Sequence, residues 1–245
     1  ALERSANQAA LEAFELALNA LGHLPETRES VAQAIDLRFE LRDALFILNR
    51  MDAILPHVEQ AEALAIQIGD RRREALAALY MSGFYWYTLQ LDLAIKRAEA
   101  ALGIAQELDD TDLIVLAHYR LATALHHLGN YRAATISADK ARELVDTKMD
   151  RRLFRFGGLV YSFCCSFQAW GLAELGELRR AEAAGRLGME LAEQAKHGYS
   201  ISVASFGLAT GYLASEQWDA AIAVLGRGLE QMELHGVNAA FGWVG

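Results

Sequence analysis

Two adjacent histidines, His126 and His127, have the side chains in this chain best suited to metal binding or acid–base chemistry. Neighbouring side chains on a helix diverge by about 100°, whereas a histidine pair that shares a metal ion is typically four residues apart. No nearby cysteine completes a ligand set, and Tyr119 is a poor zinc ligand. We therefore predict no metal site here and interpret both histidines as surface or groove residues.

Nucleophilic catalysis is no better supported. No G-x-S-x-G motif places a serine beside a histidine base. Cys164 and Cys165 are adjacent within an apolar segment, without C-x-x-C spacing, and a disulfide between neighbouring residues would be strained. They are expected to be buried thiols in a reducing, cytoplasmic compartment. The sequence predicts no catalytic residue and no cofactor.

The net charge of −9 argues against nucleic acid as a direct partner, because phosphate binding requires a basic surface. The arginine clusters at 71–73, 151–152 and 179–180 are short and scattered. We interpret them as solvated helix ends.

Residues 156–173 carry no charge over a length that approaches that of a membrane-spanning helix. Serines, a glutamine and three glycines interrupt this segment, so a buried helix is the better interpretation, and no membrane contact is predicted. Gly157 and Gly158 are expected to form a hinge or a point of close contact.

The composition favours a helical fold with a large core. Hydrophobic residues make up 53% of the chain, alanine and leucine dominate them, and there are only two prolines. Both abundant residues are good helix formers, and alanine lets helices approach closely. We expect a single all-α domain over residues 1–245.

The best-formed unit, residues 111–145, predicts two helices joined at Gly129 and Asn130. Its marks Tyr131, Ala134 and Ala141 recur at steps of 40 or 47 residues. Every corresponding position is apolar or glycine, as one helix face requires. These positions are Met51, Ile54, Ala61, Leu91, Ala94, Ala101, Leu178, Ala181, Gly188, Trp218, Ala221 and Gly228.

Turn and cap residues agree with this register. Gly129 and Gly176 precede second helices by two residues and can take the left-handed conformation, and Asn130 can cap the helix that follows. The second helix of the first pair is expected to begin later, near Leu55. The predicted elements are a helix at about 4–22, then pairs at 30–69, 70–109, 111–147, 150–196 and 198–235, and a sixth pair that opens at 237–245.

The pattern Ala122, Leu125, Gly129, Tyr131, Ala134 and Ala141 resembles the tetratricopeptide repeat (TPR). The resemblance covers nearly the whole chain and implies a right-handed α-α superhelix with repeats of about 40 residues. Shorter strings at 23–27, 37–42 and 67–70 are similar to the TPR arrays of bacterial ATPase-containing class III adenylate/guanylate cyclase-like proteins and maltose-regulator-type transcription activators. Any cyclase, ATPase or DNA-binding activity would lie outside this chain.

In TPR arrays the first helices line a concave groove. The resemblance nominates positions where aromatic and polar residues interleave, a mixture that suits peptide or small-ligand contact. Within the aromatic run 84–87, we expect Phe84 and Tyr85 in the core and Trp86 and Tyr87 in the groove. The nominated residues are Phe39, Asp43, Phe46, Leu79, Gly83, Trp86, Tyr87, Tyr119, Thr123, His126, His127, Ser166, Trp170, Glu174, Phe206 and Thr210.

The favoured function is a non-catalytic interaction module whose groove binds a peptide, a protein or another domain of the same polypeptide. The alternative is an effector sensor that binds a small molecule and controls an attached domain. The chain begins with Ala and stops where a further helix is predicted to start, so we expect a fragment of a longer protein. Uncapped apolar ends near Phe14, Leu18, Phe241 and Trp243 predict self-association.

Overall fold

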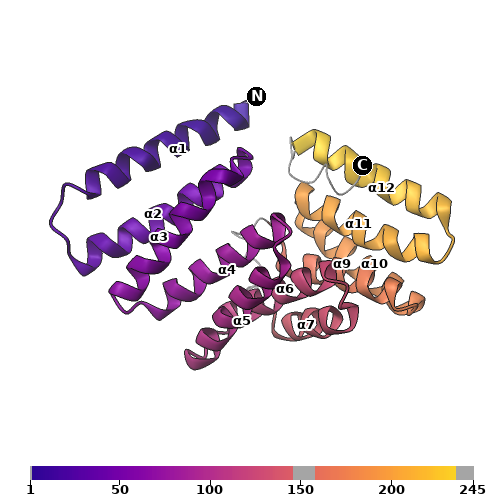
Figure 1. Ribbon diagram of the computed structural model, residues 1–245. Coiled ribbons are helices and arrows are strands. Elements are labelled where there is room, and N and C mark those ends of the chain that lie inside the picture. The colour runs from indigo at the N-terminus through magenta and orange to yellow at the C-terminus, as the bar shows by residue number, and fades with distance from the viewer. Residues whose placement is uncertain (1, 146–157, 236–245) are drawn as a thin grey trace. The chain divides into compact units, whose positions relative to one another are not determined.

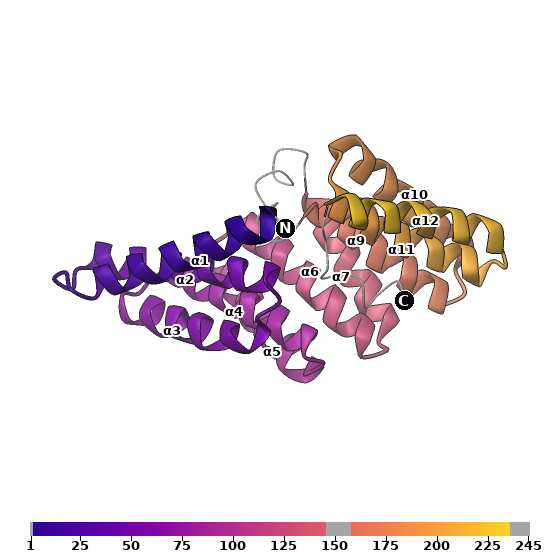
Figure 2. The ribbon, with the colours of Figure 1, turned by 90° about the horizontal axis from the view of Figure 1, so that it is seen from above.

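The computed structural model describes residues 2–145 and 158–235, which contain eleven α-helices, one short 3-10 helix and no strand. The chain divides into two compact units, residues 1–113 and 114–245. Consecutive helices run antiparallel within each unit (Figures 1 and 2). The all-α class and the packing in helix pairs are confirmed, whereas the single domain stays a prediction. The predicted sixth pair lies outside the described residues.

Unit 1 is a stack in which each helix packs against the next. The first helix of each pair contributes side chains to one layer and the second helix to the other. The elements are α1 (Leu2–Leu21), α2 (Arg28–Ile47), η1 (Met51–Ala53), α3 (Ile54–Gln67), α4 (Arg71–Tyr87) and α5 (Leu91–Glu107), followed by the start of α6 (Thr111–His127).

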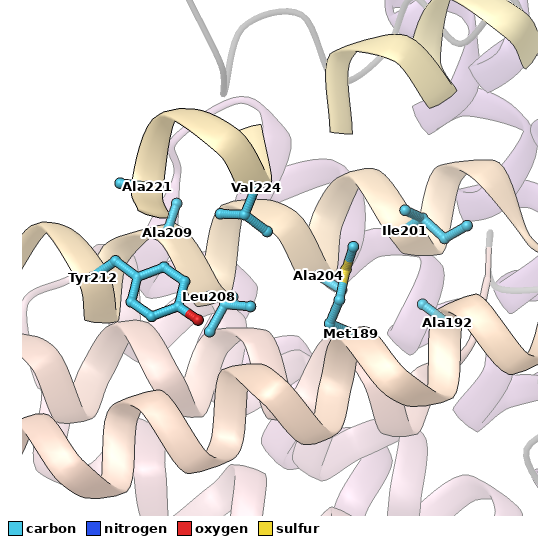
Figure 3. Packing of buried hydrophobic residues seen from close by; sticks show 9 residues of the cluster. All are labelled: Met189, Ala192, Ile201, Ala204, Leu208, Ala209, Tyr212, Ala221 and Val224. Atoms are coloured by element: carbon cyan, nitrogen blue, oxygen red, sulfur yellow. The ribbon is translucent and has the colours of Figure 1, made fainter. Parts of the chain in front are cut away.

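Unit 2 continues with the rest of α6, and its first helices pack closely on each other, since α9 packs on α11 as well as on α7 and α10. Its core between α10, α11 and α12 joins Met189, Leu208, Tyr212, Ala221 and Val224 (Figure 3). The elements are α7 (Tyr131–Leu144), α9 (Val160–Glu174), α10 (Leu178–Ala195), α11 (Gly198–Ala214) and α12 (Trp218–His235).

The predicted repeat register is confirmed by where the second helices begin. Helices α5, α7, α10 and α12 each start at the register residue itself. In the first pair the register residue Met51 opens η1 instead, and α3 begins at Ile54, one residue before the predicted Leu55. The small residues of the register are buried, so two helices can approach closely at each of them.

Residues in the left-handed conformation recur every 20 residues, from position 49 to 129 and again from 176 to 216, and each lies just after the end of a helix. Gly129 and Gly176 have φ of 83° and 75°, as predicted. Asn130 accepts a hydrogen bond from the Ala133 amide at 3.3 Å and so caps α7. The remaining left-handed residues are Asn49, Gly69, Leu89, Asp109, Lys196 and Glu216, of which only one is glycine.

The arginines at the start of α4 lie at a helix end as predicted, but they also join helices. Arg73 donates two hydrogen bonds to the carboxylate of Asp36 in α2, at 2.9 and 2.7 Å. It also contacts Asp70, the residue that caps α4, at 2.5 Å. Arg72 reaches the cap of α6, Asp110, at 2.8 Å. Arginines 151 and 152 lie outside the described residues.

Serine and glycine bring the helices of unit 2 into backbone contact. Ser162 of α9 donates to the Gly188 carbonyl at 2.8 Å, and Ser202 of α11 repeats this on Gly228 at 3.0 Å. A Cβ on Gly207 would lie 2.5 Å from the Ser166 Cα, so only glycine fits without a shift. Such pairs explain why α9 and α11 carry so few large residues on these faces.

Two further predictions concern the apolar segment before and within α9. A Cβ on Gly158 would meet the Phe163 ring at 2.6 Å, which confirms the expected close contact, while Gly157 lies outside the described residues. Cys164 and Cys165 are buried free thiols, as predicted. None of the described helices is long and apolar enough to cross a membrane.

Candidate functional site

The first helices of unit 1 contact each other through two pairs of rings. The ring centroids of Phe39 in α2 and Tyr80 in α4 are 5.0 Å apart. Those of Phe46 and Tyr87 are 6.1 Å apart. The first pair is buried, whereas Phe46 is half-buried and Tyr87 is 37% exposed. Only the second pair therefore remains accessible to a partner.

A buried arginine connects these two ring pairs. The guanidinium carbon of Arg42 lies 4.8 Å from the centroid of Tyr80 and 5.1 Å from that of Phe46. Arg42 also donates to the carboxylate of Asp43 at 2.6 Å. Asp43, a predicted groove residue, is thus half-buried and already neutralised by its neighbour.

Unit 2 has a buried ring row, which we define as Tyr119 of α6, Phe163 of α9 and Tyr199 of α11. The centroids are 6.0 Å apart from Tyr119 to Phe163 and 5.6 Å apart from Phe163 to Tyr199. Tyr119 and Phe163 are buried and Tyr199 is half-buried. This row packs three successive first helices together.

A second set of rings crosses the same three helices, and we call His127, Trp170 and Phe206 the accessible ring row. The centroid of Trp170 in α9 lies 5.7 Å from that of His127 in α6 and 4.8 Å from that of Phe206 in α11. All three side chains are half-buried. Three consecutive first helices therefore present contacting rings with part of their surface in solvent.

The two rows of unit 2 lie seven residues apart in α9 and α11 and eight residues apart in α6. Phe163 and Tyr199 lie seven residues before Trp170 and Phe206, and the same step separates the two ring pairs of unit 1. Seven residues of α-helix span about 10.5 Å, so the buried and accessible rings lie about two turns apart on the same helices. The step of seven is visible in the sequence, whereas the burial of one set is not.

His126 lies behind the accessible ring row and is only 3% exposed. Its ring centroid is 4.0 Å from that of Trp170 and 5.1 Å from that of Tyr131. Neither ring nitrogen has a hydrogen-bond partner. Burial, together with the neighbouring His127, lowers the pKa of His126 to about 3, so the ring is neutral at pH 7.

Two hydrogen bonds orient the accessible ring row. His127 donates its Nδ1 proton to the Thr123 carbonyl at 3.0 Å, because a carbonyl can only accept. Burial lowers the pKa of His127 despite that bond. Trp170 donates its Nε1 proton to Oε1 of Glu174 at 3.2 Å, one turn further along α9. A carboxylate is thereby held at the edge of the indole.

The structure separates the predicted groove residues by burial. Phe39, Tyr119 and His126 pack between helices, and Thr123 is fully buried with its hydroxyl on the Arg120 carbonyl at 2.9 Å. Leu79, Gly83 and Ser166 are also buried, while Phe46, Trp86, His127, Trp170, Phe206 and Thr210 are half-buried and Glu174 is exposed.

The expected division of the aromatic run is wrong in one respect. Phe84 and Tyr85 are half-buried rather than in the core, and their rings pack edge to face with centroids 5.6 Å apart. Trp86 is half-buried as well, so only Tyr87 is exposed. Four successive helical positions point all round the helix, and the buried residues 77–83 before them already fill the core.

A partly buried polar network between α7 and α9, with only Gln168 fully buried, was not identified from the sequence. Gln168 accepts a hydrogen bond from Arg142 and donates one to Asp139, and Arg142 also lies 3.5 Å from Asp139. Asp139 and Arg142 are three residues apart on α7, but Gln168 comes from α9, so no local pattern marks the three together. Across the described chain there is no group of three or more His, Cys, Asp or Glu side chains that could hold a metal ion.

No protein-family model matches the chain, and no curated protein sequence matches it either. Several solved structures do match the chain. A Rap protein complexed with competence and sporulation factor has a TM-score of 0.66 at 13% identity, covering 95% of this chain and 71% of that one. The apo form of RapI has a TM-score of 0.67 at 12% identity, covering 95% and 93%.

A third similar structure is a putative kinesin light chain of Podospora anserina with TPR-like repeats. Its TM-score is 0.56 at 13% identity, covering 84% of this chain and 97% of that one. Identities this low carry information on the fold alone. The protein therefore has the fold of the TPR-like helical-repeat proteins, as the repeat pattern predicted.

Proposed function

We propose that this chain is a non-catalytic interaction module that binds a peptide, or an extended segment of a protein, on its first helices. The observation that carries the proposal is the accessible ring row, in which His127, Trp170 and Phe206 contact one another from three consecutive helices. Rings held by packing offer contact area at a low cost in conformational entropy. The Rap protein complexed with competence and sporulation factor supports the proposal, because a neighbour in fold holds a partner.

The proposal is tested with a random dodecapeptide library displayed on phage. Peptides selected on the intact protein are synthesised, and their affinities are measured by fluorescence anisotropy. Truncating Trp170 or Phe206 to alanine should weaken binding by about tenfold or more, as is usual for buried aromatic anchors. Ile136→Ala, at an exposed apolar position of α7, is the control and should leave affinity unchanged.

Trp170 also packs on His126, so its truncation can loosen the fold. Phe206→Ala and Trp170→Phe supply independent readings, and far-UV circular dichroism with thermal melting monitors folding of each variant. If folded Trp170 and Phe206 variants bind the selected peptides as tightly as the Ile136 control does, the accessible ring row is not the binding surface. If no peptide is enriched, the peptide-binding function itself fails.

We further propose that the module belongs to a bacterial cytoplasmic signalling protein of the cyclase-like or maltose-regulator type, where its partner is another domain of the same polypeptide. The supporting strings are at 23–27, 37–42 and 67–70. The buried free thiols of Cys164 and Cys165 suit a reducing compartment. Sequencing the gene on both sides of this segment tests the attachment, and flanking regions without a nucleotide-binding, cyclase or DNA-binding domain would refute it.

A further inference from the structure

The first helices of unit 2 have an unusual charge distribution. Helix α11 contains no charged residue, and the only one in α9 is Glu174. Helix α6 contributes Asp112 in its first turn and Arg120, which is buried with its guanidinium over the Tyr119 ring. At the accessible ring row, the formal charge supplied by these three helices is therefore the single negative charge of Glu174.

The position of that charge is fixed by Trp170. The indole Nε1 proton is donated to Oε1 of Glu174 at 3.2 Å, and Glu174 itself is exposed. A carboxylate thus lies at the edge of a half-buried indole, whose face is an electron-rich surface for a cation. Ring and carboxylate form one continuous electronegative surface.

Two further features favour a cation at the row. His127 is the last residue of α6 and Glu174 the last of α9, so the carbonyl ends of two helices lie here and add partial negative charge. The pKa values of His126 and His127 are lowered by burial, which keeps both imidazoles neutral at pH 7. A bound cation is therefore not repelled by the histidines.

We propose that the accessible ring row receives a basic side chain of the bound peptide, an arginine or a lysine, against the solvent-exposed part of Trp170 and beside the carboxylate of Glu174. This inference rests on the proposed peptide-binding function and specifies the partner's chemistry. An acidic side chain would be repelled by Glu174. An aliphatic side chain would displace water from the Glu174 carboxylate without replacing the hydrogen bonds that the water made, which costs free energy.

The selected dodecapeptides test this specificity directly. We expect arginine or lysine to be enriched at one fixed position relative to the unselected library. Replacing an arginine there with citrulline, a neutral side chain of the same shape, should weaken binding about tenfold, the size of a partly desolvated cation–π contact with a carboxylate neighbour. The same replacement elsewhere in the peptide should have little effect.

Glu174→Gln is the matching change in the protein. It should weaken the arginine peptide and leave the affinity for the citrulline peptide unchanged, so the two changes together cost less than their sum. Glu193→Gln is the control, because Glu193 is an exposed carboxylate of α10 paired with Arg227 at 3.0 Å, away from the ring row. It should leave both affinities as they are.

The outcomes separate this inference from the proposed function. Selected peptides that bind through Trp170 and Phe206 but carry no basic residue would overturn the inference and leave the peptide-binding function standing. Citrulline and Glu174→Gln effects that add fully would also overturn it, since the two groups would then act independently. Peptides that ignore Trp170 and Phe206 altogether would remove the binding surface and the inference together.

Discussion

The imidazole of His126 and the indole of Trp170 lie with their centroids 4.0 Å apart, and neither nitrogen of that imidazole has a hydrogen-bond partner. A neutral histidine in this position behaves as an aromatic packing residue. A charged one would be buried against rings without a counter-ion, which is costly. The contact between α6 and α9 is therefore tied to the protonation state of one side chain.

We predict that acid destabilises the protein through His126. Its pKa is about 3 in the folded chain against 6.5 for the unperturbed side chain, so below pH 6.5 the unfolded state binds more protons. Stability is fully present above pH 6.5 and falls as the pH drops toward 3. Between pH 7 and pH 5, His126 should account for about 2 kcal/mol of lost unfolding free energy.

Urea denaturation of the intact chain and of His126→Phe at both pH values measures that loss. The phenylalanine ring fills the same space and does not titrate, so the variant should lose about 2 kcal/mol less than the intact chain. His126→Phe should still lose some stability, because burial also lowers the pKa values of His118 and His127. An identical loss in both proteins would mean that the pKa of His126 is the same in the folded and unfolded states.

We predict that Gly207→Ala destabilises unit 2. The new Cβ would lie 2.5 Å from the Ser166 Cα, a backbone atom that cannot rotate away, so α9 and α11 must separate. Overpacking of this kind costs about 1–3 kcal/mol. Gly103→Ala in α5 is the control: nothing lies within 4 Å of its Cβ, and it should stabilise the helix by about 0.5–1 kcal/mol. Thermal melts compare the two, and equal effects would contradict the tight contact.

We predict that Leu89→Gly stabilises unit 1. Leu89 has φ of 58° and is 71% exposed, so it loses little packing and carries the strain of a left-handed branched residue. Relief of that strain, less the entropy of glycine in the unfolded chain, should add about 0.5–1 kcal/mol. Gly69→Ala, at the corresponding turn with φ of 67° and open space around its Cβ, should cost about 1 kcal/mol. Both changes are measured by chemical denaturation, and effects of the same sign would refute the backbone explanation.

We predict self-association through the exposed face of α12. Tyr131 and Thr135 of α7 face the next first helix, where a Cβ on Gly171 would lie 3.0 Å from the Thr135 side chain. Their register equivalents in α12, Trp218 and Ile222, are 58% and 69% exposed. Two such residues on one face favour pairing with a second copy.

Light scattering over a concentration series measures the association. Trp218→Lys combined with Ile222→Lys should shift the protein toward the monomer, whereas lysine at exposed Glu190 of α10 should not. A monomer at high concentration in the intact protein would contradict the prediction. Of the other residues expected to cause association, Phe14 and Leu18 are half-buried, and Phe241 and Trp243 lie outside the described residues.

Local chemistry explains why the register could be predicted. Small residues such as Ala134 and Ala141 recur because two helices cross there in every repeat, and their spacing follows from helix geometry alone. Glycine marks some turns because it takes the left-handed conformation without strain, which is also a local property. The turns at Leu89, Asp109 and Glu216 carry no such mark, because packing of the flanking helices holds those residues left-handed against their own preference.

The sequence by itself therefore determined the helix pairs, their boundaries and the positions of the rings along each first helix. Only the tertiary structure decided which rings form the surface. Tyr119 and His127 are both aromatic residues on α6, yet the first is buried by α9 and the second is half in solvent. Burial depends on how far the neighbouring helix extends over each ring, and that neighbour lies more than 30 residues away in the sequence.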